Sequence, residues 1–360
     1  MGVTRPFALP GSYLVVETTN QCSLACVHCT VSEGSAHPHH ARTGFMPPAL
    51  FDRVLDDLSR HRAHFDTLVP FWLGEPLIHG EFGAIYRSAL RAAGAGTFDR
   101  VEVHTNATHL GRDRVRIALN DAPVRQTWHL SLDATTRDRY RAIKGRDSFE
   151  EVEANVLAFL DEKARTGARW PRPVFQMIVS ENNEAETGEF HRRWTAACER
   201  RRIPVRSAAQ VVPPGDDAVV FFRQLDAPTP ALQASANAAF RQAMGRLGLP
   251  LPRADRTAPE VSRGPGVCGC FWKSPVVAWD GTVTTCTRDN RLQNALGNVN
   301  DRGFCDIWFG SGMAHHRRSV ATGNYADLLA CQGCYIPQSA NYADISRAEI
   351  ATTLAPPAPA

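Results

Sequence analysis

Short hydrophobic runs alternate with helical segments through the first two hundred residues of the chain. Five runs are rich in β-branched and aromatic residues and are typical of buried strands: YLVVET (13–18), TLVPFWL (67–73), VEVHT (101–105), WHLSLD (128–133) and VFQMIV (174–179). A weaker run lies near 204–212. Helical windows lie near 48–62, 80–93 and 184–201, and another begins at Ser148 in a capping-box sequence, SFEE. This alternation predicts a parallel sheet, either open or barrel-like.

Polar motifs follow the first three expected strands directly. The first strand leads into a cysteine-rich segment, the second into GEP (74–76) and the third into Asn106. Because parallel α/β folds bind ligands at the carboxyl ends of their strands, we expect these motifs to share one site.

The composition limits the classes of function. The chain has 360 residues, 43% of them hydrophobic, and a net charge of +3, which is too small to argue for nucleic acid. No run approaches the roughly 18 to 20 apolar residues of a membrane span, and the start of the chain lacks a signal-peptide pattern. We therefore expect a cytoplasmic protein, in which ten cysteines indicate metal binding or catalysis rather than disulfides.

The pattern divides the chain into four parts. Residues 1–212 are expected to form the α/β domain, and 213–265 a helical insertion and linker that opens with the break VVPPGDD. Residues 266–345 carry closely spaced cysteines and are expected to form a small metal-bound module. The tail, 346–360, ends in LAPPAPA and is expected to be disordered.

The segment NQCSLACVHC places Cys22, Cys26 and Cys29 in the spacing C-x3-C-x2-C. A structural zinc site has four ligands, so His28 or His37 would have to complete one here. An iron–sulfur cube held by only three cysteines instead leaves one iron open to a small molecule. The nearby AHPHH (36–40) is expected to be a solvated loop.

The order of these motifs resembles the radical S-adenosylmethionine (SAM) superfamily. FWLGEPL, VHTNATHL, HLSLDATTRDRYRAIKG and FQMIVSENNEAE match its second to fifth strand segments, although Ala107 replaces the usual glycine and Lys144 stands where an arginine is common. The resemblance implies a partial (β/α)6 TIM-like barrel, with a [4Fe-4S] cluster on the three cysteines. It also implies that SAM binds at His28, Gly74, Glu75, Pro76, Asn106, Ser131 and Asp133.

A second cysteine set resembles the auxiliary-cluster domain of such enzymes, called twitch in its short form and SPASM in its longer one. The sequence VCGCFWKSPVVAWDGTVTTC is followed at a distance by CQGC. The resemblance implies a second [4Fe-4S] cluster on Cys268, Cys286, Cys331 and Cys334. Cys270 also fits the loose spacing; Cys268 is favoured because it lies in C-x3-W before Trp272. A structural zinc ribbon is the alternative.

The reaction is less constrained than the cofactors. Similar enzymes, such as 2-deoxy-scyllo-inosamine dehydrogenase and aminoglycoside epimerases, act on sugars or aminocyclitols; others modify ribosomal peptides or sulfatases. Only 21 residues precede Cys22, so we expect no leader-binding domain and favour a carbohydrate-type substrate, oxidised from carbinol to ketone.

The alternatives are an epimerase in which Cys270 donates hydrogen, a peptide or sulfatase maturase, and a non-enzymatic iron–sulfur or zinc regulatory protein. The resemblance also implies a flavodoxin or ferredoxin as the electron donor. Cys198 and Cys305 are expected to be small buried hydrophobic residues.

Overall fold

A computed structural model describes residues 9–120, 122–227, 230–251, 267–332, 334, 345–346 and 349–350. The expected disordered end of the tail and the linker over 252–266 lie outside the described residues.

One ten-stranded sheet runs through the described chain in the order β10-β9-β8-β1-β2-β3-β4-β5-β7-β6. Strands β1 to β8 pair in parallel, and only β9 and β10 join antiparallel. The strands are β1 (Tyr13–Val16), β2 (Phe65–Val69), β3 (Phe98–Thr105), β4 (Arg125–Ser131), β5 (Arg172–Val179), β6 (Val205–Ala209), β7 (Ala218–Gln224), β8 (Val276–Val277), β9 (Thr282–Thr284) and β10 (Gly297–Asn298).

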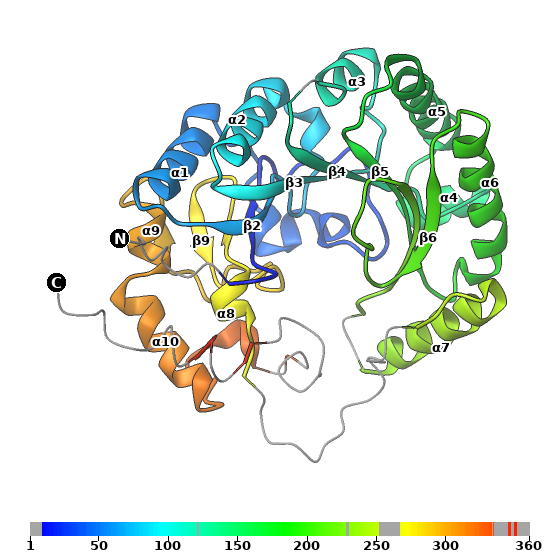
Figure 1. Cartoon of the computed structure of the whole chain (residues 1–360). Helices are drawn as coiled ribbons and strands as arrows, with labels where there is room; N and C mark the ends of the chain where they lie inside the picture. The colour runs from blue at the N-terminus through cyan, green and yellow to red at the C-terminus, as the bar shows by residue number, and fades with distance from the viewer. Residues whose placement is uncertain are drawn as a thin grey trace.

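Helices cover the outer side of the curved sheet, and Figure 1 shows α1, α2, α3, α5 and α6 in an arc around the strands. The α-helices are α1 (Pro48–Arg60), α2 (Phe82–Gly94), α3 (Arg112–Ala118), α4 (Arg137–Lys144), α5 (Phe149–Thr166), α6 (Thr187–Glu199), α7 (Pro230–Leu247), α8 (Cys270–Lys273), α9 (Phe304–Trp308) and α10 (Ser311–Ala321). Ser148 is the N-cap of α5 as expected, but its side chain makes no capping hydrogen bond. None of the described helices has the length and apolar character needed to cross a bilayer.

The core between sheet and helices is built from alternate strand residues. On β4, Trp128 and Leu130 are fully buried; the Trp128 indole donates a 2.9 Å hydrogen bond to Tyr86 on α2 and stacks on Phe159 of α5. His129 lies between them in sequence and therefore faces the inner side of the sheet. The α/β fold with a parallel sheet, expected from the sequence, is confirmed.

The interval 213–265 differs from the expectation of a helical insertion and linker. It contains β7, which pairs in parallel with β5 on one side and β6 on the other. The sequence pattern does not predict a strand at AVVFFRQ, because the turn residues Pro213, Pro214 and Gly215 come shortly before it. Its place in the sheet follows from its burial: six of its seven residues are buried, whereas β6 is only partly covered and forms the edge. Only α7 matches the expected helix of this interval.

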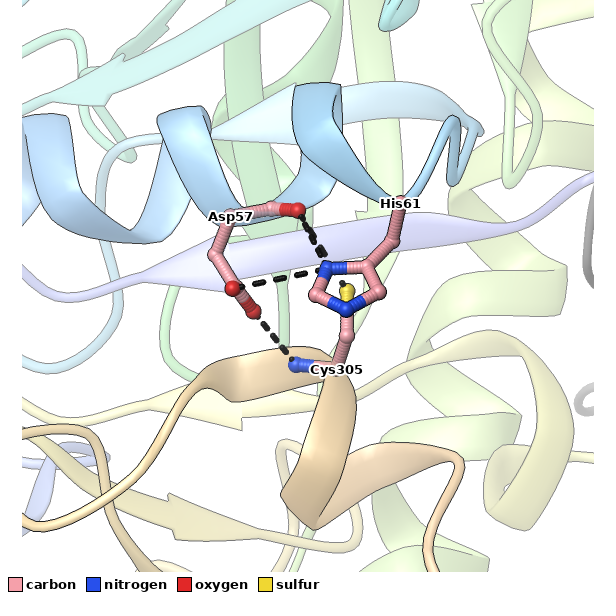
Figure 2. Close-up of side chains that lie close together, drawn as sticks. All are labelled: Asp57, His61 and Cys305. Carbon is pink, nitrogen blue, oxygen red and sulfur yellow. Dashed lines mark hydrogen bonds and ion pairs between the residues drawn. The ribbon is translucent and has the colours of Figure 1, made fainter.

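The C-terminal module continues the barrel sheet. β8 pairs with β1, with Val276 beside Val15. On the helical side, α9 docks against α1, and Figure 2 shows Asp57 of α1 meeting the first turn of α9 at Cys305. The Asp57 carboxylate accepts the Cys305 backbone N–H at 2.8 Å. Cys198 and Cys305 are both buried, as expected.

Candidate functional site

The loop after β1 carries the first three cysteines and is held against the end of α4. The backbone N–H groups of Ala25 and Val27 donate to the carbonyls of Lys144 and Ile143, at 3.1 and 2.9 Å. The Cys29 N–H closes a turn on the Cys26 carbonyl at 3.0 Å. These bonds fix the loop, and its three cysteines are half-buried.

Two glycines let neighbouring backbone pack against this loop. A Cβ on Gly74 would lie 2.1 Å from the Thr19 carbonyl oxygen, and one on Gly145 would lie 2.4 Å from that of Ala25. Gly145 also has a φ of +72°, which favours glycine. Gly74 of the GEP motif therefore has a steric reason to be glycine that is independent of any ligand.

Glu75 joins the ends of β2 and β3. Its side chain is 1% exposed and accepts hydrogen bonds from Thr105 Oγ1 (2.7 Å) and from the N–H groups of Asn106 (2.7 Å) and Leu77 (3.0 Å). Burial raises its pKa to about 7, although these donors act in the opposite direction. Glu75 thus aligns the two strand ends, and Pro76 follows it as the first residue of the short helix η3 (Pro76–Ile78).

Asn106 reaches the first cysteine directly. Its Nδ2 lies 3.5 Å from Cys22 Sγ and 3.2 Å from Ser23 Oγ. The Leu24 N–H also donates to Cys22 Sγ at 3.4 Å. Hydrogen bonds to cysteine sulfur are among the features that set the potential of an iron–sulfur cluster. Ala107, where the resemblance expects glycine, has a positive φ of 63°, which explains the usual preference.

Ser131 and Asp133 meet Lys144, which lies beneath the cysteine loop. Lys144 Nζ donates to Asp133 Oδ2 at 2.5 Å and to the Ser131 carbonyl at 2.9 Å, and Asp133 Oδ1 accepts the Ile178 N–H at 2.6 Å. The Asp133 side chain is fully buried, with both oxygens engaged within the chain. Burial alone would lower the pKa of Lys144, but the Asp133 charge raises it. Ser131 is half-buried and stays a predicted SAM contact; Asp133 is better placed to hold Lys144.

The three histidines of the AHPHH segment are buried, although Ala36 and Pro38 are exposed, so the expectation of a solvated loop was wrong. His37, His39 and His40 are 0%, 6% and 6% exposed. The physical reason is Glu17, a buried carboxylate that follows β1 and accepts a 2.8 Å contact from His39 Nε2. By contrast, His28 in the cysteine loop has an exposed side chain, consistent with its predicted place beside SAM.

The second cysteine set also comes together, with Cys270 in its centre. The Cys270 thiol hydrogen-bonds to both Cys268 and Cys286; these contacts raise the pKa of Cys270 and lower those of its two neighbours. Asn294 Nδ2 donates to Cys331 Sγ at 3.4 Å, and the Cys334 N–H donates to the Cys331 carbonyl at 3.1 Å. The five cysteines of this module therefore gather in one region.

Tyr325 ties one side of this set together. Its hydroxyl accepts the Cys268 N–H at 3.1 Å, and the charges of Cys268, Cys331 and Cys334 all act on the Tyr325 phenol. The choice of Cys268 over Cys270 as the fourth ligand stays a prediction. Cys270 is only 2% exposed, which makes it a poor donor of hydrogen to a substrate.

The arrangement of the sulfur atoms in the described residues differs from that around a single zinc ion. Around one tetrahedral zinc with Zn–S of about 2.3 Å, sulfur atoms lie roughly 3.8 Å apart. Among the described residues, neither cysteine set supplies three ligand atoms that all lie within 4.8 Å of one another. Burial raises the pKa of Cys22 and of Cys331 to about 12, so binding of metal must displace protons from these thiols.

Contacts between the two cysteine regions were not visible in the sequence. The Trp72 indole, just before GEP, donates a 3.1 Å hydrogen bond to the carbonyl of Thr287, the residue after Cys286. Glu17 also accepts the Trp279 N–H at 3.2 Å, from a residue 262 positions away. In the sequence, these contacts are marked only by a Trp that follows the second strand and a Glu that follows the first.

Comparison with known families agrees with this geometry. Residues 16–170 match the radical SAM superfamily, and residues 268–335 match SPASM, an iron–sulfur cluster-binding domain. The chain therefore carries a radical SAM domain followed by a SPASM domain, which imply SAM and [4Fe-4S] clusters as cofactors.

Curated relatives cover part of the chain. It is 30% identical over 171 residues to GTP 3',8-cyclase of Paracoccus denitrificans, covering 45% of this chain and 46% of that one. It is 26% identical over 180 residues to mycofactocin maturase MftC of Mycobacterium ulcerans, covering 49% and 42%. The matches thus span just under half the length of these relatives.

Solved structures share the fold over more of the chain. BtrN in complex with AdoMet and 2-DOIA aligns with a TM-score of 0.52 and 16% identity, covering 94% of this chain and 97% of that one. Streptococcus suis SuiB bound to S-adenosylmethionine gives 0.55 and 14%, covering 88% and 68%. AnSMEcpe with bound AdoMet gives 0.55 and 12%, covering 96% of each. Identities this low show a common fold only.

Proposed function

We propose that this radical SAM enzyme with a SPASM domain oxidises a carbinol carbon of a sugar or aminocyclitol to a ketone. In this proposal Cys22, Cys26 and Cys29 hold the cluster that binds SAM, and the second cysteine set holds a closed cluster. When bound, the first cluster and SAM supply a 5′-deoxyadenosyl radical that removes a hydrogen atom from the substrate.

The observation that carries the proposal is the presence of two thiol sets, one with three members and one with five. Three thiols follow β1, five gather in the C-terminal module, and the Trp72–Thr287 hydrogen bond joins their surroundings. A closed cluster has no free coordination position for a substrate, but it can accept an electron. Oxidation of an alcohol needs such an acceptor after hydrogen removal. BtrN, whose solved structure is a complex with AdoMet and 2-DOIA, shares its fold over 94% of this chain, and the proposed substrate class is taken by analogy with it.

Several of the chain's own residues hold the parts of this site in place. Glu75 and Asn106 hold the β2 and β3 ends beside Cys22, and Lys144 anchors the cysteine loop from below. In the proposed reaction, such residues would help to keep water from a reactive radical. We expect His28 and Ser131 to meet SAM, and a flavodoxin or ferredoxin to supply electrons.

The test is anaerobic reconstitution followed by incubation with SAM, dithionite and candidate substrates. About eight irons per chain, 5′-deoxyadenosine, and one ketone per SAM without deuterium from D2O are expected. Deuterium at the abstracted carbon, lost in Cys270→Ala, would support an epimerase instead. Zinc without iron, and intact SAM, would leave only a regulatory protein.

A peptide maturase is the second candidate. SuiB bound to precursor peptide SuiA aligns with a TM-score of 0.55 over 95% of this chain, and a partial relative is a maturase. A peptide cross-link or oxidised peptide side chain, formed in place of a ketone on a free sugar, would favour this candidate.

A further inference from the structure

Two histidines stack face to face on neighbouring strands. His104 on β3 and His129 on β4 are partners in the parallel register. Their ring centroids lie 4.2 Å apart with an interplanar angle of 6°. Phe71 stacks on His104 at 5.2 Å, and Phe221 of β7 meets His129 edge-on at 6.2 Å.

The pair faces the inner side of the barrel. Val103 and Trp128, its sequence neighbours, belong to the core that packs under the outer helices. Because successive strand residues point to opposite faces, His104 and His129 point inward. Inner-face valines and aromatics likewise form clusters separate from that core.

The pair lies close to the predicted SAM site. His104 precedes Asn106 by two residues, and His129 precedes Ser131 by two, so each shares a strand face with a predicted SAM contact. Two residues span about 6.6 Å along a strand. The imidazoles therefore lie about two residues further into the barrel than the predicted SAM contacts.

His129 and Gln176 carry polar atoms on this face that no hydrogen bond within the described chain satisfies. His129 is 5% exposed, and within the described chain neither of its ring nitrogens has a hydrogen-bond partner. Gln176 of β5, also 5% exposed, has an unpartnered Oε1. Buried polar atoms are nearly always hydrogen-bonded, so these atoms are available to a ligand that carries donors and acceptors, such as a hydroxyl group.

A carboxylate accompanies the imidazoles. Glu102 Oε1 lies 3.9 Å from His129 Nε2, and Arg100 Nε lies 3.8 Å from the same oxygen. Burial alone would raise the pKa of Glu102, but His129 and the other positive groups lower it to about 2. Burial lowers the pKa of His104 well below its usual value, so that ring is neutral at pH 7. Two further cations act on this group: Arg172 of β5 on Glu102, and Arg223 of β7 on His104.

Ring geometry argues against a metal ion at this place. Glu102, His104 and His129 do bring three ligand atoms within 4.8 Å of one another, the set that a 2-His-1-carboxylate iron site uses. An imidazole binds metal along a lone pair in its ring plane. Two parallel rings stacked 4.2 Å apart cannot both aim such lone pairs at one ion.

We propose that the His104–His129 pair binds the hydroxyl group of the carbon to be oxidised and accepts its proton; this rests on the proposed function. After hydrogen-atom removal, the O–H bond breaks and its proton goes to a neutral ring nitrogen of His104. The carbon–oxygen bond becomes a carbonyl, and the auxiliary cluster that the second cysteine set would hold would take up the remaining electron. His104 is the acceptor because it is only half-buried, and the nearby Glu102 carboxylate offsets the new positive charge.

The experiment compares wild-type holoenzyme with His104→Gln, His129→Gln and Glu102→Gln, with His191→Gln as a control on the outer helix α6. The probes are 2-deoxy-scyllo-inosamine, other free aminocyclitols and monosaccharides. We expect His104→Gln to lower ketone formation about 100-fold while 5′-deoxyadenosine still forms. Glu102→Gln should move the acidic limb of the ketone pH profile to lower pH, because a carboxylate favours the protonated imidazole. A purely structural role would not move this limb.

A second readout does not need turnover. In protein labelled with [ε1-13C]histidine and free of clusters, the His104 resonance should stay that of a neutral ring below pH 6, and binding of an unreacted probe should shift it. Suppose that wild type is active and that His104→Gln and Glu102→Gln leave the ketone yield and the pH profile unchanged. This result would overturn the assignment of the histidine pair but not the proposed function. If His104→Gln does not fold, His129→Gln and the Glu102→Gln profile decide. Wild type that forms no ketone from any probe would overturn the proposed function, and this assignment with it.

Discussion

Asp57 on α1 caps the first turn of α9 across more than 200 residues of sequence, accepting the Cys305 N–H at 2.8 Å. The carboxylate is 4% exposed and also lies within 3 Å of where a Cβ on Gly303 would stand. The barrel helix thus supplies the N-cap that the short helix α9 lacks in its own sequence (Figure 2).

Removing this cap should loosen the C-terminal module. Asp57→Ala leaves a buried N–H unpaired, so we expect a loss of about 1–3 kcal/mol in the free energy of unfolding. Asp57→Asn keeps one acceptor oxygen and should lose less. Chemical denaturation measures both, with exposed Asp301→Ala as the control. Equal stability of Asp57→Ala and Asp301→Ala would show that the cap is dispensable.

Alanine at Gly74 or Gly145 should prevent assembly of the first cluster. The new Cβ would lie 2.1 or 2.4 Å from a carbonyl of the cysteine loop, so the backbone must move. We expect each variant to bind about four fewer irons after reconstitution. Gly80→Ala is the matched control, because its Cβ meets nothing within 4 Å. Full iron content in Gly74→Ala would contradict the predicted role of the close contact.

Lys144→Met should leave the buried Asp133 charge without its ion-pair partner. Breaking a buried ion pair by removing one partner costs about 3–5 kcal/mol, and the Lys144 and Asp133 side chains are 2% and 0% exposed. The double variant Lys144→Met/Asp133→Leu should recover part of this loss. Thermal and chemical unfolding test this, and the exposed pair Arg137–Asp147 provides control substitutions with little effect. A double variant no better than the single would argue against the charge explanation.

We expect two variants, Cys268→Ala and Cys270→Ala, to show which of these cysteines is a ligand of the auxiliary cluster. If Cys268 is the fourth ligand of the auxiliary cluster, Cys268→Ala loses about four irons, whereas Cys270→Ala keeps about eight. Iron analysis and the electron paramagnetic resonance spectrum of the reduced protein measure this. The reverse pattern would assign Cys270 as the ligand.

His40 should make the fold acid-sensitive. Burial first, and then the charges of His39 and His37, lower its pKa from 6.5 to about 4. The unfolded chain therefore takes up this proton before the folded one, so stability is present above pH 6.5 and is lost as the pH falls toward 4. We expect His40→Asn to remove about 1–3 kcal/mol of this pH dependence. Urea denaturation at pH 7.5 and 5 tests it, with exposed His109→Asn as the control; parallel curves for His40→Asn and wild type would refute it.

The sequence indicated the parts of the fold that depend on local pattern. Strand runs with buried residues and the polar motifs at their ends predicted the sheet, and Gly74 and Gly145 lie where the backbone needs them. The β5-β7-β6 order could not be read locally, because strand order depends on which run is most apolar.

Long-range partners in the site were equally hidden from the sequence. The burial of His39 depends on Glu17, and the place of Trp72 depends on Thr287. Neither pair is close in sequence, so periodicity carried no sign of it. The burial of the AHPHH histidines could not be predicted from the sequence for the same reason.

The pairing of β8 with β1 cannot form until the C-terminal module has been synthesised. Strand β1 is made first, yet one of its two neighbours consists of Val276 and Val277, which leave the ribosome more than 250 residues later. At about 5–20 residues per second, that edge waits unpaired for tens of seconds. An open strand edge can pair with another chain, so the nascent protein is exposed to aggregation for as long as its own C-terminal module is unfinished. Truncation before β8 should therefore yield insoluble barrels, rather than a smaller working enzyme.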